Sequence, residues 1–169
     1  MHNLEAKFRL TNHALAHQRA LAIGFEPRGI FIQRDTFFAT PNGKLKLREQ
    51  GGESWLIHYS RGEQRELQLS NYTIVPVSDP GPMRTMLADA LGLLAEVRKH
   101  RTLMMRRNVR LHLDRIEGLG DFGEIEVVLA DHCAPEAFRD EVARILADLG
   151  VALGDLIKHS YFELMKLEK

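Results

Sequence analysis

The chain opens with a regular alternation of polar and apolar residues, which is the pattern of a β-strand with one buried face. Between Asn3 and Leu10 the polar side chains take the odd positions and the apolar ones the even positions. Similar segments recur along the chain, separated by turn signals such as Gly51-Gly52. We therefore predict eight strands, over residues 3–10, 29–39, 44–49, 54–61, 72–77, 96–104, 109–114 and 123–130.

Four other segments repeat their apolar residues at helical spacing. They predict helices over residues 12–23, 80–91, 135–149 and 154–167. The second begins after Asp79, a good N-cap, and ends at Gly92, and its inner stripe includes Met86 and Leu91. The class is α+β, with about eight mostly antiparallel strands and a few amphipathic helices that each cover an apolar face of the sheet.

The chain's composition narrows the classes of protein to consider. A length of 169 residues predicts one domain, spanning 1–169. The 23 basic and 23 acidic side chains balance, which argues against a nucleic-acid partner. Cys133 is alone and can form no internal disulfide, and no apolar run is long enough to span a membrane. We expect a cytoplasmic protein that does not bind membranes.

Charged residues on the predicted strands are spaced two apart, so the members of each group point to one side of their strand. These groups are Glu5 with Lys7, Lys46 with Arg48, Lys99 with Arg101, Arg110 with His112 and Asp114, and Glu124 with Glu126. An open sheet with one dry and one solvated face would produce the same alternation. If the sheet closes, the charges converge in an interior, where they require a ligand. A triphosphate on Lys and Arg, with Mg²⁺ or Mn²⁺ on the carboxylates, matches both kinds of charge.

Seven segments in order resemble successive blocks of the CYTH superfamily, which includes class IV adenylate cyclases and thiamine or inorganic triphosphatases. The first, "NLEAKF" at Asn3–Phe8, is similar to the ExExK signature of that family. The others are "QRDTFF" from Gln33, "GKLKLRE" from Gly43, "WLIHYSR" from Trp55, "VRKHR" from Val97, "VRLHLD" from Val109 and "EIEVVL" from Glu124. The resemblance implies a barrel of eight strands that forms a triphosphate tunnel with flanking helices.

The resemblance also implies roles for individual residues. The implied triphosphate ligands are Lys7, Lys46, Arg48, His58, Arg61, Lys99, Arg101 and Arg110. The implied metal ligands are Glu5, Glu124, Glu126 and Asn3, and the implied catalytic residues are Glu5, Asp114 and Glu124. His58 and Arg61 lie on opposite faces of one strand, so both cannot point inward. Asp114 would orient the metal or a basic neighbour.

Two residues depart from the family pattern. Asn3 replaces the first glutamate of the signature, and its amide brings no charge to a metal. His58 stands where triphosphatase relatives tend to carry a lysine, and an imidazole at this position binds phosphate more weakly than an ammonium group. Three functions stay open: an adenylate cyclase, a triphosphatase, and a nucleotide or polyphosphate binder without catalysis. Chain length, the LKLR and VxKxR segments and the closing "SYFEL" favour the first, and the resemblance also implies a possible homodimer.

Overall fold

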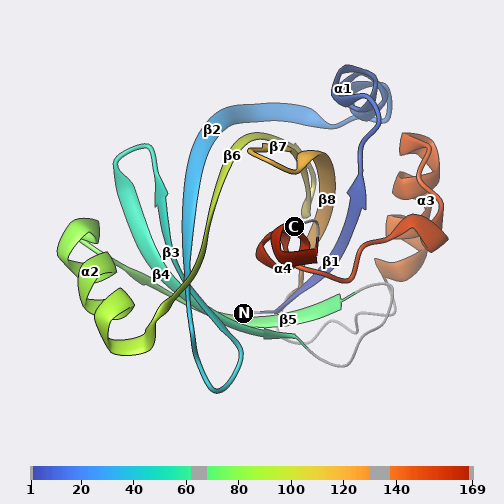
Figure 1. The fold of residues 1–169 in the computed structure, drawn as a ribbon. Helices are drawn as coiled ribbons and strands as arrows, with labels where there is room; N and C mark the ends of the chain where they lie inside the picture. The colour runs from blue at the N-terminus through green and yellow to red at the C-terminus, as the bar shows by residue number, and fades with distance from the viewer. Residues whose placement is uncertain (1, 62–67, 130–137, 168–169) are drawn as a thin grey trace.

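Eight antiparallel strands close on one another to form a barrel (Figure 1). The structure is a computed structural model that describes residues 2–61, 68–129 and 138–167. The strands are β1 (His2–Arg9), β2 (Glu26–Phe38), β3 (Lys44–Gln50), β4 (Glu53–Arg61), β5 (Gln68–Pro76), β6 (Leu93–Arg106), β7 (Val109–Ile116) and β8 (Gly120–Leu129). Around the barrel they follow the order β1-β5-β4-β3-β2-β6-β7-β8. The predicted α+β class and the closed antiparallel barrel are confirmed.

The longest strands extend beyond their predicted ends. β2 begins at Glu26, ahead of the predicted start at Gly29, and it pairs with β6 over almost its whole length. A break in the register lies between Pro27 and Gly29. The strand continues through this irregularity because a bulge accommodates residues that interrupt regular pairing.

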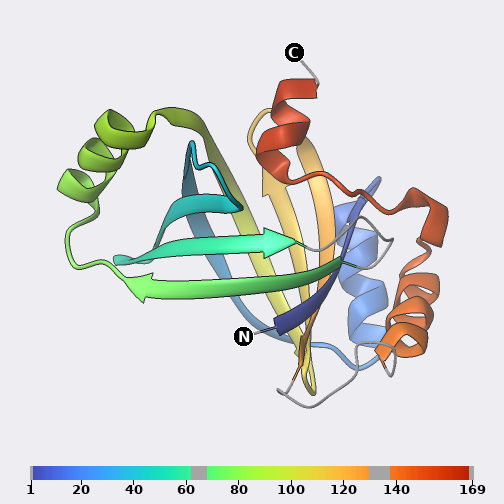
Figure 2. The same cartoon turned by 90° about the horizontal axis from the view of Figure 1, so that it is seen from below.

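The apolar faces of β1, β7 and β8 form the main hydrophobic core with two helices, α1 (His13–Ala22) and α3 (Arg139–Leu149). Figures 1 and 2 show both helices on the outside of this part of the barrel. The core residues of the three strands are Leu4, Ala6, Phe8, Val109, Leu111, Leu113, Ile125 and Val127. Gly123 lies opposite Phe8, whose ring leaves no room for a Cβ atom there. Burial of this face fixes which side of each strand points into the barrel.

The C-terminal segment closes one end of the barrel. Helix α4 (Tyr161–Leu167) buries Tyr161, Phe162 and Leu164 against Phe37 of β2 and Phe122 of β8. This helix is shorter than the one predicted over residues 154–167. It begins only at Tyr161, and the earlier part of the predicted range contains a 3-10 turn (Leu153–Asp155). The helix begins where the Glu163 carboxylate accepts hydrogen bonds from both the backbone and the hydroxyl of Ser160.

Helix α2 (Pro80–Leu91) lies on the opposite side of the barrel from α1 and α3 (Figure 1). Its caps are as predicted, but the expected burial of its apolar stripe is wrong: no residue of α2 is buried, and Met86 is 56% exposed. The Arg84 guanidinium instead donates to the Glu49 carboxylate of β3 at 2.7 Å. None of the helices in the described residues has the length and apolarity to cross a membrane.

Candidate functional site: a charged cavity inside the barrel

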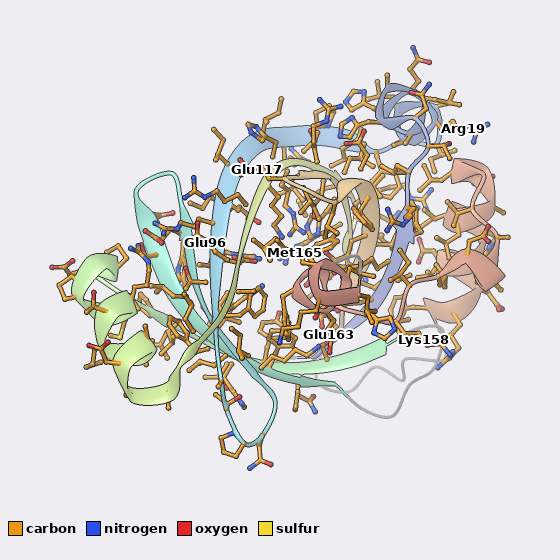
Figure 3. All side chains as sticks on the ribbon, in the orientation of Figure 1. Arg19, Glu96, Glu117, Lys158, Glu163 and Met165 are labelled. Atoms are coloured by element: carbon orange, nitrogen blue, oxygen red, sulfur yellow. The ribbon has the colours of Figure 1, made fainter. Side chains whose placement is uncertain are left out.

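The inner faces of the strands enclose a cavity of about 410 Å³. Each strand contributes alternate residues, as Asn3, Glu5 and Lys7 do on β1, because successive side chains of a strand point to opposite faces. Ser160 and Tyr161 line the end that α4 closes, and Figure 3 shows Glu163 and Met165 of that helix in the view along the barrel. The charged faces therefore meet in an interior, which excludes the open sheet with a solvated face.

In the part of the chain that the structure describes, six cationic side chains from four strands line this cavity. They are Lys7 of β1, Lys46 and Arg48 of β3, Lys99 and Arg101 of β6, and Arg110 of β7. Lys7, Lys99 and Arg101 are buried, whereas the side chain of Arg110 is 41% exposed. Buried cations need counter-charges in the free protein. Two aspartates supply most of that charge for β3 and β6.

Asp35 of β2 binds the cations of β3. Its two carboxylate oxygens accept hydrogen bonds from Arg48 Nε and Nη2, both at 2.7 Å, and Oδ2 accepts one from Lys46 Nζ at 3.1 Å. Lys99 Nζ is 3.8 Å from the same oxygen. Burial alone would raise the pKa of Asp35, but Arg48, Lys46 and Lys99 together hold this pKa well below its usual value. Asp35 is therefore ionised and fixes the cations in place.

Asp114 of β7 has the same role for β6. It accepts two hydrogen bonds from Arg101, at 2.7 and 2.6 Å, and a third from the Tyr161 hydroxyl at 3.1 Å. Asp114 is fully buried and does not line the cavity. Burial raises the pKa of Tyr161 well above its usual value, so the phenol keeps the proton that it donates. Asp114 is thus placed to position Arg101 and Tyr161, and a bound ligand would contact those residues first.

The carboxylates of β1 and β8 form a second group. Glu124 accepts from Lys7 at 3.2 Å and from Arg101 at 3.0 Å. Glu126 accepts from Arg110 at 3.5 Å and from the amide nitrogen of Asn3. Glu5 is the direct cross-strand partner of Glu126. Like charges directly opposite each other destabilise a sheet, so a cation between these two strands would relieve the repulsion.

The donor chemistry of this second group fits a divalent metal. Mg²⁺ and Mn²⁺ prefer oxygen ligands, and Glu5, Glu124, Glu126 and the Asn3 amide all reach the same cavity. In the described part of the chain, however, no three His, Cys, Asp or Glu side chains are already gathered around one point. Metal binding would therefore require rotation of side chains, with the lysine and arginine partners of Glu124 moving to a phosphate.

A profile of the CYTH domain matches residues 1–161. The chain belongs to the CYTH family. Among curated proteins it is similar to one from Methanocaldococcus jannaschii that is provisionally named an adenylate cyclase. The two are 25% identical over 138 residues, which are 80% of this chain and 77% of the relative.

Solved structures share the CYTH barrel. The PH1012 protein of Pyrococcus horikoshii superposes with a TM-score of 0.87 at 25% identity, over 96% of this chain and 98% of the other. A Hippeastrum protein, described as an adenylyl cyclase candidate with a dominant triphosphatase activity, has a TM-score of 0.69 at 19% identity. That match covers 99% of this chain and 96% of the neighbour. The likeness to the Hippeastrum protein shows the fold alone.

Besides Asp114, two residues of the predicted CYTH site are not among the described residues that line the cavity. His58 of β4 is exposed on the outer face, where its Nε2 lies 3.0 Å from the carbonyl oxygen of Asn42. Its neighbours Ile57 and Tyr59 occupy the inward positions, so the alternation of β4 turns His58 away from a ligand. Arg61 ends β4, and its side chain lies outside the described residues. The ten other predicted site residues besides Asp114 all line the cavity: Asn3, Glu5, Lys7, Lys46, Arg48, Lys99, Arg101, Arg110, Glu124 and Glu126.

Sequence reasoning assigned no role to three residues of this site: Asp35, His112 and Tyr161. Asp35 is the single charge on the inner face of β2, so it had no charged neighbour two positions away to mark it. Tyr161 comes from a helix and follows no strand alternation. His112 shares a face with Arg110 and Asp114, and this shared face was the one signal that could have placed it in the site.

Proposed function

We propose that this CYTH protein is a metal-dependent enzyme that binds a triphosphate in the barrel and acts as an adenylate cyclase, converting ATP to cyclic AMP and pyrophosphate. The observation that carries the proposal is that, among the described residues, six cationic side chains and three glutamates converge in one cavity. A triphosphate carries about four negative charges near neutral pH, which Lys and Arg donors neutralise with charge-assisted hydrogen bonds. The provisional name of the Methanocaldococcus relative favours the cyclase.

Different residues would bind the phosphates and the metal. Lys46, Arg48, Lys99 and Arg101 bind phosphate oxygens, and their aspartate partners keep them in place. Mg²⁺ or Mn²⁺, held by Glu5, Glu124 and Glu126, would neutralise charge on the phosphates and polarise a phosphate oxygen. In the cyclase reaction the ribose 3′ oxygen forms a bond to the α-phosphorus while the bond to the bridging oxygen of the β-phosphate breaks. The hydroxyl proton passes to solvent, and pyrophosphate leaves on the cationic side chains.

A triphosphatase is the second candidate. The same cage would hold the substrate while water attacks the terminal phosphorus and orthophosphate leaves. The dominant triphosphatase activity named for the Hippeastrum neighbour, which has the same fold, favours this alternative. A third function, binding without turnover, follows if Asn3 leaves too little negative charge for a metal.

Product analysis separates the three functions. Purified protein is incubated with ATP and Mn²⁺, and then with tripolyphosphate and with thiamine triphosphate. Cyclic AMP with pyrophosphate is the expected result. Orthophosphate instead supports the triphosphatase, and tight binding without any product supports the binder.

Glu124→Gln tests the metal-dependent part of the proposal. The change removes a carboxylate charge while preserving size, so turnover is expected to fall by about a hundredfold or more, as is usual when a catalytic electrostatic contact is lost. Binding of tripolyphosphate without metal should remain, because the change removes no cation. Glu117→Gln is the matched control, since Glu117 is exposed and does not line the cavity (Figure 3). Full activity in Glu124→Gln would refute the assignment of Glu124.

A further inference from the structure

His112 is a buried histidine with one unsatisfied ring nitrogen. It lies on β7, directly opposite Glu124 of β8, and it lines the cavity. Only 7% of the residue is exposed, yet its Nδ1 has no hydrogen-bond partner within the described structure. Most buried side-chain nitrogens have such a partner, so an orphan that faces a cavity points to a missing ligand.

The two ring nitrogens of His112 face the two glutamates of β8. Nδ1 is 3.8 Å from Glu124 Oε2, and Nε2 is 3.9 Å from Glu126 Oε2. Both separations exceed hydrogen-bonding distance. They also lie between the two ligand spacings of an octahedral ion with bonds of about 2.1 Å, which are about 3.0 Å for adjacent and about 4.2 Å for opposite ligands. One ring nitrogen and its facing glutamate can therefore share a cation only after a side-chain rotation.

We infer that His112 is a ligand of the divalent metal, together with Glu124 or Glu126, and that this nitrogen makes the site prefer a first-row transition ion over Mg²⁺. The inference rests on the proposed metal-dependent function and narrows its cofactor. Mg²⁺ favours oxygen ligands almost exclusively, whereas imidazole is a good ligand for transition ions. A site built from Glu5, Glu124 and Glu126 alone would give Mg²⁺ no such disadvantage.

The geometry also shows what binding must change. The imidazole and the carboxylates lie at the ends of side chains, so rotation about their side-chain bonds can bring them closer to one ion. Lys7 and Arg101 now hold Glu124, and a bound triphosphate would offer those two cations other partners. Metal and triphosphate should therefore bind cooperatively, each tighter in the presence of the other.

Pulsed electron paramagnetic resonance of Mn²⁺ on the wild-type protein tests the inference directly. The expected spectrum shows coupling of the Mn²⁺ electrons to a directly bound ¹⁴N nucleus, and this coupling disappears in His112→Asn. Titrations should show Mn²⁺ affinity falling by about tenfold or more in the variant, with Mg²⁺ affinity falling by less than about threefold, since the lost donor is one that Mg²⁺ does not favour.

His58→Asn is the matched control, because His58 is exposed on the outer face and does not line the cavity. It should keep both the ¹⁴N coupling and the Mn²⁺ affinity. Wild-type protein that binds no Mn²⁺, or binds it without ¹⁴N coupling, would overturn the inference, and this result does not depend on whether His112→Asn folds. Binding of tripolyphosphate without metal is measured in parallel, so a failure of the metal assignment is distinguished from a failure of the triphosphate site.

Discussion

Two parts of the barrel interior hold opposite charges in different ways. The cationic wall consists of Asp35, Lys46, Arg48, Lys99 and Arg101, with Asp114 beneath it. The carboxylate wall consists of Asn3, Glu5, Lys7, Glu124 and Glu126. In the cationic wall, each aspartate receives two hydrogen bonds from one guanidinium at 2.6–2.7 Å. In the carboxylate wall, Glu124 accepts single hydrogen bonds from Lys7 at 3.2 Å and from Arg101 at 3.0 Å, and Glu126 accepts one from Arg110 at 3.5 Å and one from the Asn3 amide.

This difference indicates that the cationic wall is assembled before a ligand arrives. Bidentate pairs fix the orientation of Arg48 and Arg101, so little reorganisation is needed when a phosphate binds. The carboxylate wall contains the opposed pair Glu5 and Glu126, which a cation would complete. A preformed anion site beside an incomplete metal site explains why triphosphate binding is expected without metal and turnover is not.

The largest expected effect comes from breaking the cationic wall. Asp35→Ala leaves Lys46, Arg48 and Lys99 without their shared counter-charge, and removing one partner of a buried ion pair costs about 3–5 kcal/mol. Glu126→Ala should cost clearly less, because it also removes the repulsion with Glu5. Urea unfolding of both variants measures the difference.

Unfolding of the same variants in the presence of tripolyphosphate gives a second test of the difference between the two walls. It should recover part of the stability lost in Asp35→Ala, since it supplies negative charge to the same cations. Asp121→Ala is the surface control, because Asp121 pairs with the exposed Arg115 and should change the unfolding midpoint very little. Equal losses for Asp35→Ala and Glu126→Ala would show that the two walls do not differ in the way described.

The two walls were not equally predictable from the sequence. Paired charges on β1, β3, β6 and β8 showed which residues share a face, because alternation is a property of any strand. The sequence did not mark Asp35 as a site residue, because the other residues on the same inner face of its strand, Phe31, Gln33 and Phe37, are uncharged. The cross-strand register sets its pairing with Arg48, and sequence spacing does not encode that register.

The helices were also predicted only in part from the sequence. Turn and cap residues correctly bounded α2, but its apolar stripe did not reveal that it would pack loosely beside β2 and β3. The fourth helix was predicted too long, since helical spacing continued through a segment that folds as a 3-10 turn. Burial depends on which surface the barrel presents, and that surface exists only after closure.

A smaller effect is expected from the pH dependence of the cationic wall. Burial and the neighbouring Arg48 lower the pKa of Lys46 to about 8, from 10.5 in an unfolded chain. Lys46 therefore loses its charge as pH rises through about 8, and tripolyphosphate affinity should fall by about tenfold or less, the effect expected of one charged donor.

Stability of the free protein should respond in the opposite direction. Between pH 8 and 10.5 the unfolded chain keeps the Lys46 proton that the folded protein has released, so the contribution of Lys46 makes stability rise with pH. Calorimetric titration and thermal unfolding at several pH values measure the two trends. Lys46→Arg keeps its charge and should flatten both, and a variant with an unchanged pH profile would contradict the role of Lys46.

The smallest expected effect is a gain in the carboxylate wall. Asn3 lies two residues before Glu5 on the same face of β1, and its amide donates to Glu126. Asn3→Glu replaces that donor with a third negative charge near Glu5 and Glu126, which a divalent ion would bridge. Mn²⁺ affinity should rise by about threefold to tenfold, as expected for one added carboxylate ligand in a partly solvated site.

Calorimetric titration of Mn²⁺ into the wild-type protein and into Asn3→Glu measures the gain. The affinity for tripolyphosphate in the absence of metal is expected to weaken slightly. Equal Mn²⁺ affinities would mean that Asn3 is outside the metal's reach, and the carboxylate wall would then end at Glu5.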